Sequence, residues 1–363
     1  FHNTVFKHQP HAIIFSDVGP GTRWVGNENG IAGTTNWSTL NVKGFEPGAK
    51  GPSQKVLNEG VEDGEKWVPA ECDVSIRPGW FYSPSTDDKV KSLSQLLTIY
   101  YGSVGRNGNL LLNVPVDRRG LIHANDSTRL MELRKTLDEA FKNNLAKNKK
   151  ISASQTRGNA KKFGAANAND ENYDTYWTTD DNITNASFEI DLGKQTEINR
   201  IVLQEYIPLG QRVKSYSVEY WNGNEFKQID SQTTIGYKRI LAFPSVQTSK
   251  VRVNIRDAKA CPVISEVQLY KAPEMLAAPL ISRNKDGIVS IRSESMDAVI
   301  TYTTDGSEPK YTSPRYSKTF EMPLGGTVKA KAFINNGASS GETVSVEYDL
   351  APSKWTVKDG GKE

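Results

Sequence analysis

Cysteine is scarce in this 363-residue sequence, which has only two, Cys72 and Cys261. They lie far apart and in different predicted domains, so we expect no disulfide and predict a free, buried thiol at each position. Histidine is almost as scarce. The four histidines show neither the spacing of a metal site nor that of a catalytic triad, so we expect surface or core positions for His2, His8, His11 and His123.

Long hydrophobic runs and blocks of one charge are also missing. No apolar stretch approaches the ~18 residues of a membrane span. The net charge of +3 is small and scattered, and no basic run interleaved with aromatics indicates a nucleic-acid partner. The sequence has no signal peptide and begins with Phe rather than Met. We interpret it as processed or cut, so its first residue says nothing about export.

What is present predicts several folded domains. The length suggests two or three, and seven Trp, 14 Tyr and 12 Phe are enough for their cores. Residues 1–148 alternate between strand and helix patterns, with strands near 12–15, 67–76 and 109–114 and helices near 86–100 and 126–145. Three parallel-type strands are part of an eight-stranded (β/α) barrel, so we predict a partial (β/α)8 barrel.

The rest of the chain reads as β-structure. Residues 149–272 show short alternating segments between turn signals, which predict an antiparallel β-sandwich of jelly-roll, discoidin-like type. Residues 275–350 alternate in the same way and predict a small immunoglobulin-like β domain. Residues 351–363 are polar and rich in Gly and Lys, and we expect a flexible tail.

Residues 23–30 carry the first chemical signal. They follow the strand at 12–15 and hold Arg23, Trp24 and Glu28, and loops at the carboxyl ends of barrel strands are where such folds carry out chemistry. An aromatic face for the ring, a charged donor for hydroxyls and an acid for proton transfer suit a sugar. The alternative is a structural ion pair between Arg23 and Glu28, with Trp24 in the core.

Several uncommon strings recur together and in order: 9–10, 14–17, 19–20, 23–28, 37–38, 67–71, 75–82 and 108–113. With them, residues 1–148 resemble the second half of the catalytic domain of a glycoside hydrolase family 29 α-L-fucosidase. Residues 149–272 resemble a discoidin-type (factor 5/8 C-type) carbohydrate-binding module. Residues 275–350 resemble a chitobiase C-terminal β domain, chiefly through Tyr302–Pro309.

The resemblance implies a retaining exo-hydrolase that removes terminal α-linked fucose, from the subgroup that prefers α1-3/4 linkages. Such chemistry needs two carboxyl groups. By resemblance Glu28 is the acid/base, and Glu71 is the competing candidate, whose alternative is a buried carboxylate bonded to Arg77 or to backbone. Arg23 is expected to donate to fucose hydroxyls, and Trp80 is either the aromatic platform for the sugar or a core residue beside Phe81.

The sequence also departs from that family. The nucleophilic Asp is expected one strand upstream of Gln9-Pro10, in a string that is absent here, and Asp17 is not assigned that role. We therefore expect at most half an active site, completed by the upstream half of the same enzyme or by another chain. An open half barrel would expose sheet edges, which is an aggregation hazard.

In the predicted sandwich, residues 168–177 resemble the calcium loop of discoidin-type modules. The resemblance assigns a structural Ca²⁺, for which oxygen ligands are suited, to Asp170, Asn172, Thr175 and Glu266. The alternative is an Asx-rich turn without metal. Tyr206, Arg212 and Tyr237 fall in predicted loops and are candidates for sugar contact.

We therefore expect a glycosidase that needs no cofactor for catalysis, acts on fucosylated oligosaccharides or glycoconjugates and is extracytoplasmic, either periplasmic or secreted. One alternative is a non-catalytic glycan-binding or interaction fragment, based on the missing nucleophile. A retaining glycosidase for another sugar has no support outside these strings.

Overall fold

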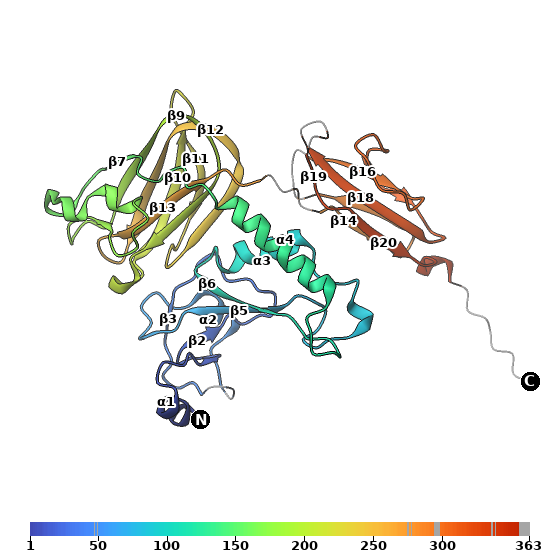
Figure 1. Cartoon of the computed structure of the whole chain (residues 1–363), viewed down its shortest axis with the longest axis horizontal. Helices are drawn as coiled ribbons and strands as arrows, with labels where there is room; N and C mark the ends of the chain where they lie inside the picture. Colours follow the sequence, from blue (N-terminus) through green and yellow to red (C-terminus); the bar gives the residue numbers. More distant parts are fainter. Residues whose placement is uncertain are drawn as a thin grey trace, which may run out of the picture. The chain divides into compact units, whose positions relative to one another are not determined.

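The structure is a computed structural model that describes residues 1–46, 48, 50–273, 276, 278–293, 298–334, 337 and 339–355. The chain forms two compact units, Phe1–Ala272 and Pro273–Glu363 (Figure 1). The predicted boundary at 148/149 falls inside the first unit, between a helix and a strand, and that division stays a prediction. None of the helices among the described residues is long and apolar enough to cross a bilayer.

A four-stranded parallel sheet forms the first part of unit 1. Its order is β1 (Phe15–Ser16), β2 (Thr22–Trp24), β5 (Ala70–Ser75) and β6 (Gly108–Asn113), and every neighbouring pair is parallel. The structure confirms the strands expected near 67–76 and 109–114. It also adds β2 within the segment expected to be a loop, so Arg23 and Trp24 lie in a strand.

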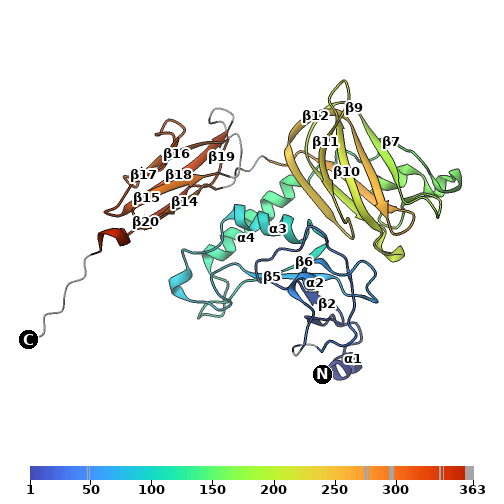
Figure 2. The ribbon, with the colours of Figure 1, turned by 180° about the vertical axis from the view of Figure 1, so that it is seen from behind.

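Helices pack on one face of this sheet, as both views show (Figures 1 and 2). The alternate strand residues Val74, Leu110 and Leu112 meet Leu96 and Ile99 of α3 (Leu93–Ser103), and Leu130 and Leu133 of α4 (Ala124–Ala140). α3 begins later than expected because Ser92 and Gln95 form a reciprocal capping box. The opposite face carries the alternate residues, among them Trp24, Glu71 and Asp73.

Shorter elements complete this part. They are α1 (His2–His8), α2 (Gln54–Glu59), the antiparallel pair β3 (Thr39–Leu40) and β4 (Lys66–Trp67), and a 3-10 turn at Pro84–Thr86. α2 is not among the helices predicted from the sequence. The Ser53 hydroxyl accepts from the backbone N–H of Val56 and caps it.

Residues 150–270 form the predicted antiparallel sandwich. Its strands are β7 (Lys150–Ala153), β8 (Trp177–Thr178), β9 (Ala186–Glu205), β10 (Val213–Trp221), β11 (Phe226–Gln232), β12 (Arg239–Ala258) and β13 (Val263–Tyr270). They run in the order β11-β10-β12-β9-β13-β8, and β7 also pairs with β9. β9 and β12 pair along nearly their whole lengths, with register shifts where they bend from one layer into the other. Short 3-10 turns at 157–159, 161–163, 165–168 and 207–209 lie in the loops.

Unit 1 is held together by a buried polar junction between sheet and sandwich. Asn36 is fully buried; its backbone carbonyl accepts from the Gln211 amide at 2.9 Å and from the Asn107 amide at 3.0 Å. Its backbone N–H donates to the Thr234 hydroxyl at 2.9 Å. The Asn107 side-chain oxygen accepts from the backbone N–H of Tyr237 at 2.8 Å. Three of these four bonds join segments that the sequence separates by more than a hundred positions.

Unit 2 contains two small antiparallel sheets. One joins β14 (Leu280–Arg283), β15 (Ile288–Arg292) and β17 (Phe320–Glu321). The other joins β18 (Gly326–Ile334) to β16 (Val299–Thr303), β19 (Ser339–Ser340) and β20 (Val344–Tyr348). Val289, Ile291, Val328 and Ala330 form the core. The immunoglobulin-like assignment stays a prediction. Of the predicted tail, Pro352–Lys354 forms a 3-10 turn, and residues 356–363 lie outside the described residues.

Candidate active site

The carboxyl ends of β2, β5 and β6 bring Glu28 and Trp80 together. Glu28 lies four residues beyond β2 and is exposed. The indole N–H of Trp80, in the segment after β5, donates to Glu28 Oε2 at 2.9 Å. The side-chain amide of Asn113, at the end of β6, donates to the Trp80 carbonyl at 3.0 Å. A carboxyl group that is exposed and also oriented by a neighbouring donor has the geometry required of a general acid/base.

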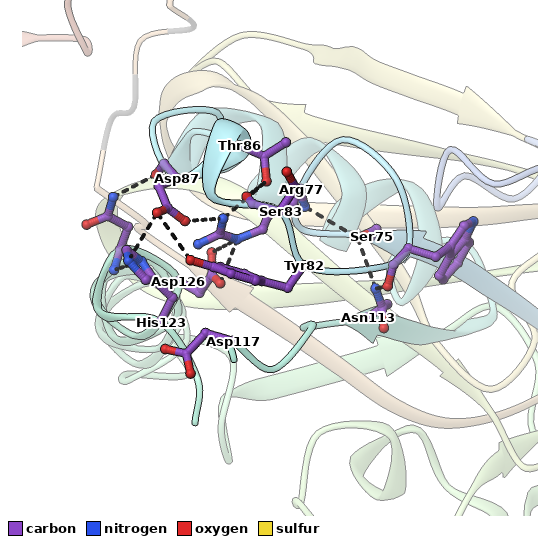
Figure 3. Close-up of polar contacts among 12 residues, drawn as sticks. Ser75, Arg77, Tyr82, Ser83, Thr86, Asp87, Asn113, Asp117, His123 and Asp126 are labelled. Carbon is purple, nitrogen blue, oxygen red and sulfur yellow. Dashed lines mark hydrogen bonds and ion pairs between the residues drawn. The ribbon is translucent and has the colours of Figure 1, made fainter. Parts of the chain in front are cut away.

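Asn113 also fixes the start of the Trp80 segment. Its amide donates to the Ser75 hydroxyl at 3.0 Å (Figure 3). Arg77, which also precedes Trp80, holds the segment further: its Nε donates to both Asp126 oxygens at 2.9 and 2.8 Å, and its Nη1 donates to Asp87 at 2.7 Å (Figure 3). Arg77 and Asp126 are fully buried. The chain just before Trp80 is therefore anchored to β6 and to the start of α4, and Arg77 ties it to Asp87, which lies beyond Trp80.

A second carboxylate on the same face of the sheet is Asp73, which sequence reasoning did not select. It accepts from the indole N–H of Trp24 at 2.8 Å. Burial raises the pKa of Asp73 above its ordinary value, and the nearby Glu28 carboxylate acts in the same direction. The alternation of β5 was the available signal: Asp73 shares a face with Glu71 and lies closer to the carboxyl end. Trp24 is thus placed beside the candidate site.

Glu71 lies further from that end. It is partly buried, and its Oε2 accepts from the Thr22 hydroxyl at 3.1 Å. The alternative contact with Arg77 does not occur, because the Arg77 guanidinium bonds to Asp87, Asp126 and Thr86 instead. Position and exposure favour Glu28 over Glu71 as the group that can reach a substrate.

The predicted sugar contact of Arg23 does not fit the structure. Arg23 is fully buried on the opposite face of β2 from Trp24. Its guanidinium donates to the carbonyls of Leu57, Val68 and Trp37 and to the Asn36 side chain. None of these bonds is the ion pair with Glu28 that was the alternative interpretation of Arg23. Burial lowers the pKa of Arg23 to about 10. Arg23 is therefore a structural residue that fastens β2 to its surroundings.

The candidate calcium residues meet at one loop of the sandwich. The Thr175 hydroxyl donates to Asp170 Oδ2 at 2.8 Å, and Asp170 Oδ1 accepts from the backbone N–H of Asn172 at 2.9 Å. Glu266 is fully buried; its Oε2 accepts from the backbone N–H of Glu171 at 3.1 Å, and its Oε1 has no partner among the described residues. Burial, aided by Asp170 and Glu171, raises the pKa of Glu266 to about 8.

An unpartnered buried carboxylate oxygen beside oxygen-rich side chains fits a hard cation such as Ca²⁺. Within the described part of the chain, no group of three or more His, Cys, Asp or Glu side chains is arranged to hold a metal ion. A cation here would therefore also need hydroxyl, amide or backbone oxygens.

The remaining sequence candidates have ordinary partners. His123 caps α4 and lies 3.5 Å from Asp87. Tyr206 stacks on Tyr176 at 4.6 Å, and the Arg212 guanidinium donates to the Cys261 carbonyl at 2.9 Å. Both cysteines are free and buried, as predicted.

Comparison with known families gives three matches in the predicted order. Residues 33–140 match the Alpha-L-fucosidase family, residues 167–253 the NedA-like, galactose-binding domain, and residues 282–345 the Chitobiase/beta-hexosaminidase C-terminal domain. The matches confirm the predicted architecture. Glu71 and Trp80 fall inside the first matched stretch, and Glu28 falls just before it.

Several proteins similar to this chain are named as fucosidases. The chain is 40% identical over 270 residues to alpha-L-fucosidase 1 of Arabidopsis thaliana, covering 73% of this chain and 53% of that protein. Among solved structures, SpGH29 is 33% identical with a TM-score of 0.70, covering 75% of this chain and 59% of that one. A Ruminococcus gnavus GH29 fucosidase in complex with fucose is 32% identical with a TM-score of 0.62, covering 70% and 51%. The chain spans about half the length of the curated relatives it matches.

Proposed function

From its match to the Alpha-L-fucosidase family and its likeness to fucosidases of known structure, we propose that this chain is part of a retaining exo-α-L-fucosidase that releases terminal fucose from glycans. The observation that carries the proposal is the hydrogen bond from Trp80 to Glu28 at the carboxyl ends of parallel strands. In barrel enzymes this end of the sheet holds the catalytic groups.

In this proposal Glu28 is the general acid/base. It gives a proton to the leaving-group oxygen as the bond to fucose breaks, and then takes one from the water that releases the sugar. Trp80 fixes the direction of the carboxyl group through its N–H, and its ring offers an apolar face to the sugar. Asp73, held by Trp24, supplies a second carboxylate on the same face of the sheet.

The nucleophilic carboxylate is proposed to come from polypeptide outside these residues, in agreement with the length of the relatives. We propose a preference for α1-3/4-linked fucose and an extracytoplasmic location, both from the family resemblance. Ca²⁺ is proposed to bind beside Asp170 and Glu266, where it would neutralise the buried carboxylate and brace the loop without taking part in catalysis.

The test is fucose release by the full-length gene product with Glu28→Gln. A lost general acid lowers kcat/KM by about 10²- to 10⁴-fold on a Lewis-type trisaccharide. The loss is smaller on an aryl fucoside whose leaving group needs no proton. Glu71→Gln tests the competing acid, and Glu225→Gln, which removes an exposed glutamate paired with Lys227, is the matched control.

Equal activity of Glu28→Gln and wild type on both substrates would exclude the role of Glu28. Absence of fucose release by the unaltered protein would instead favour the second candidate, a non-catalytic glycan-binding protein. That candidate is favoured by the match of residues 167–253 to a galactose-binding domain.

A further inference from the structure

A second cavity lies away from Glu28 and Trp80, at the amino-terminal end of the sheet. It has a volume of about 400 Å³ and is bounded by residues of β4, the start of β6 and two loops of the sandwich. Its size falls within the ~300–1,000 Å³ of ligand sites in proteins. The residues that matter below are Trp67, Asn109, Ile207, Tyr237 and Lys238.

The walls of this cavity are fixed by the junction between sheet and sandwich. Tyr237 is held on both sides of its peptide: its N–H donates to Asn107 at 2.8 Å, and its carbonyl accepts from the Gln204 amide at 3.0 Å. Gly236 has φ +72°, and a Cβ there would lie 2.2 Å from the Asn107 side chain. Trp67 is held by the pairing of β3 and β4. A ligand therefore meets preformed walls, which lowers the entropic cost of binding.

Four polar groups at the cavity have no hydrogen-bond or ion-pair partner within the described ranges. They are the Lys238 ammonium, the Asn109 amide, the Trp67 indole N–H and the Tyr237 hydroxyl. The Trp67 and Tyr237 side chains are 42% and 63% exposed, so their rings are available as well. Aromatic faces combined with unpaired hydrogen-bonding groups are the surfaces that saccharide rings and hydroxyls match.

Among the described residues, Lys238 is the only charged one that bounds the cavity. Burial lowers the pKa of Lys238 below its ordinary value, which means that its ammonium has lost part of its hydration without gaining a counter-ion. A ligand anion beside Nζ would supply that counter-ion through a charge-assisted hydrogen bond.

We propose that this cavity binds an anionic saccharide, with a sugar ring against Trp67 or Tyr237 and a carboxylate or sulfate group against Lys238. The proposal concerns a site separate from Glu28 and does not depend on the proposed fucosidase activity. Neither the sheet nor the sandwich forms the cavity by itself, so the site is a property of their junction.

The experiment measures binding to the full chain by titration calorimetry with three ligands that share one scaffold: lactose, 3′-sialyllactose and lactose 3′-sulfate. We expect at least one acidic ligand to bind about tenfold or more tightly than lactose, and its affinity to fall as salt is added. Binding of sialyllactose alone identifies a carboxylate site, and binding of the sulfate alone identifies a sulfate site.

Lys238→Met should abolish the difference in affinity between the acidic ligands and lactose. Lys194→Met removes an exposed lysine of the same sandwich and should preserve that difference. Trp67→Ala should lower the affinity for all three ligands about tenfold. Trp355→Ala changes a tryptophan of unit 2 that is 68% exposed, and it should leave these affinities unchanged. If Trp67→Ala does not fold, the lysine pair decides alone.

The proposal is overturned if neither acidic ligand binds more tightly than lactose, or if Lys238→Met leaves their advantage intact. Fucose release should be the same for Lys238→Met and wild type. A variant that loses fucose release but still binds the acidic ligands, or a variant that loses ligand binding but still releases fucose, therefore separates this site from the one at Glu28.

Discussion

The sandwich and the parallel sheet of unit 1 differ in how completely their strands are buried. The sandwich encloses one large core, in which Trp177, Phe188 and Tyr216 are at most 1% exposed. The parallel sheet has helices on one face only; on the other face Leu111 is 46% exposed, and carboxylates and tryptophans stand beside it. The candidate chemistry lies on the incompletely packed part. The larger buried core therefore lies in the sandwich, and the candidate functional groups lie on the exposed face of the sheet.

The largest effect that tests this contrast is a truncation in the sandwich core. Trp177→Ala removes a fully buried ring that packs edge-on against Phe188 at 5.4 Å and should cost about 3–5 kcal/mol of unfolding free energy. Leu111→Ala, on the uncovered face, should cost less than about 1 kcal/mol. Urea unfolding followed by circular dichroism measures both. Equal losses would mean that the uncovered face is packed in solution.

The next effect is a pH dependence of stability that arises from a buried carboxyl group of the sandwich. Burial raises the pKa of the Glu205 carboxyl, which accepts from three backbone N–H groups, from 4.5 to about 7. The unfolded chain releases this proton near pH 4.5 and the folded chain near pH 7, so stability should fall as pH rises between these values. This change in the pKa of Glu205 corresponds to roughly 3 kcal/mol of unfolding free energy.

Glu205→Gln should flatten this slope in unfolding measurements between pH 4.5 and 7, and Glu225→Gln should not. The pKa of Glu266 is also raised, to about 8, so this carboxyl group likewise lowers stability as pH rises. Added Ca²⁺ should therefore raise stability most above that pH if the ion binds there. A slope unchanged by Glu205→Gln would place the titrating group elsewhere.

A smaller effect should follow from Asn107→Ala, at the junction of the two parts. The change leaves the Tyr237 N–H without its acceptor and puts alanine at φ +58°. One unpaired buried group costs about 1–3 kcal/mol. Asn182→Ala, at an exposed asparagine, is the control. Two separate unfolding transitions in the Asn107 variant would show that the junction makes sheet and sandwich cooperative; a single unshifted transition would contradict that role.

The smallest effect is expected on the exposed side of α4. Arg134 pairs with Asp138 at 2.6 Å, but both side chains are more than half exposed. Arg134→Ala should change stability by no more than about 0.5 kcal/mol. A larger loss in the same urea assay would indicate that this helix face is covered in solution.

Local patterns predicted much of this fold. Alternation and turn signals predicted the antiparallel sandwich of residues 149–272, and the buried runs near 67–76 and 109–114 located β5 and β6. Arg23 was misassigned because its string was treated as a loop. In a strand, Arg23 and Trp24 must face opposite sides, and the same rule would have placed Asp73 beside Glu71.

The junction was beyond reach of such reasoning. Asn36, Asn107 and Gln211 are ordinary polar residues in the sequence. Their meeting depends on how sheet and sandwich pack, and neither periodicity nor turn chemistry contains that information. The cavity at Trp67 and Lys238 is a product of the same packing and was equally invisible.

The bond between Trp80 and Glu28 closes wholly within these residues, and so do the contacts of Asn113 and Arg77 that support it. The proposed proton donor is consequently oriented by residues of this chain alone. In the proposed enzyme, a segment that supplies the nucleophile would meet a carboxyl group whose orientation is already fixed.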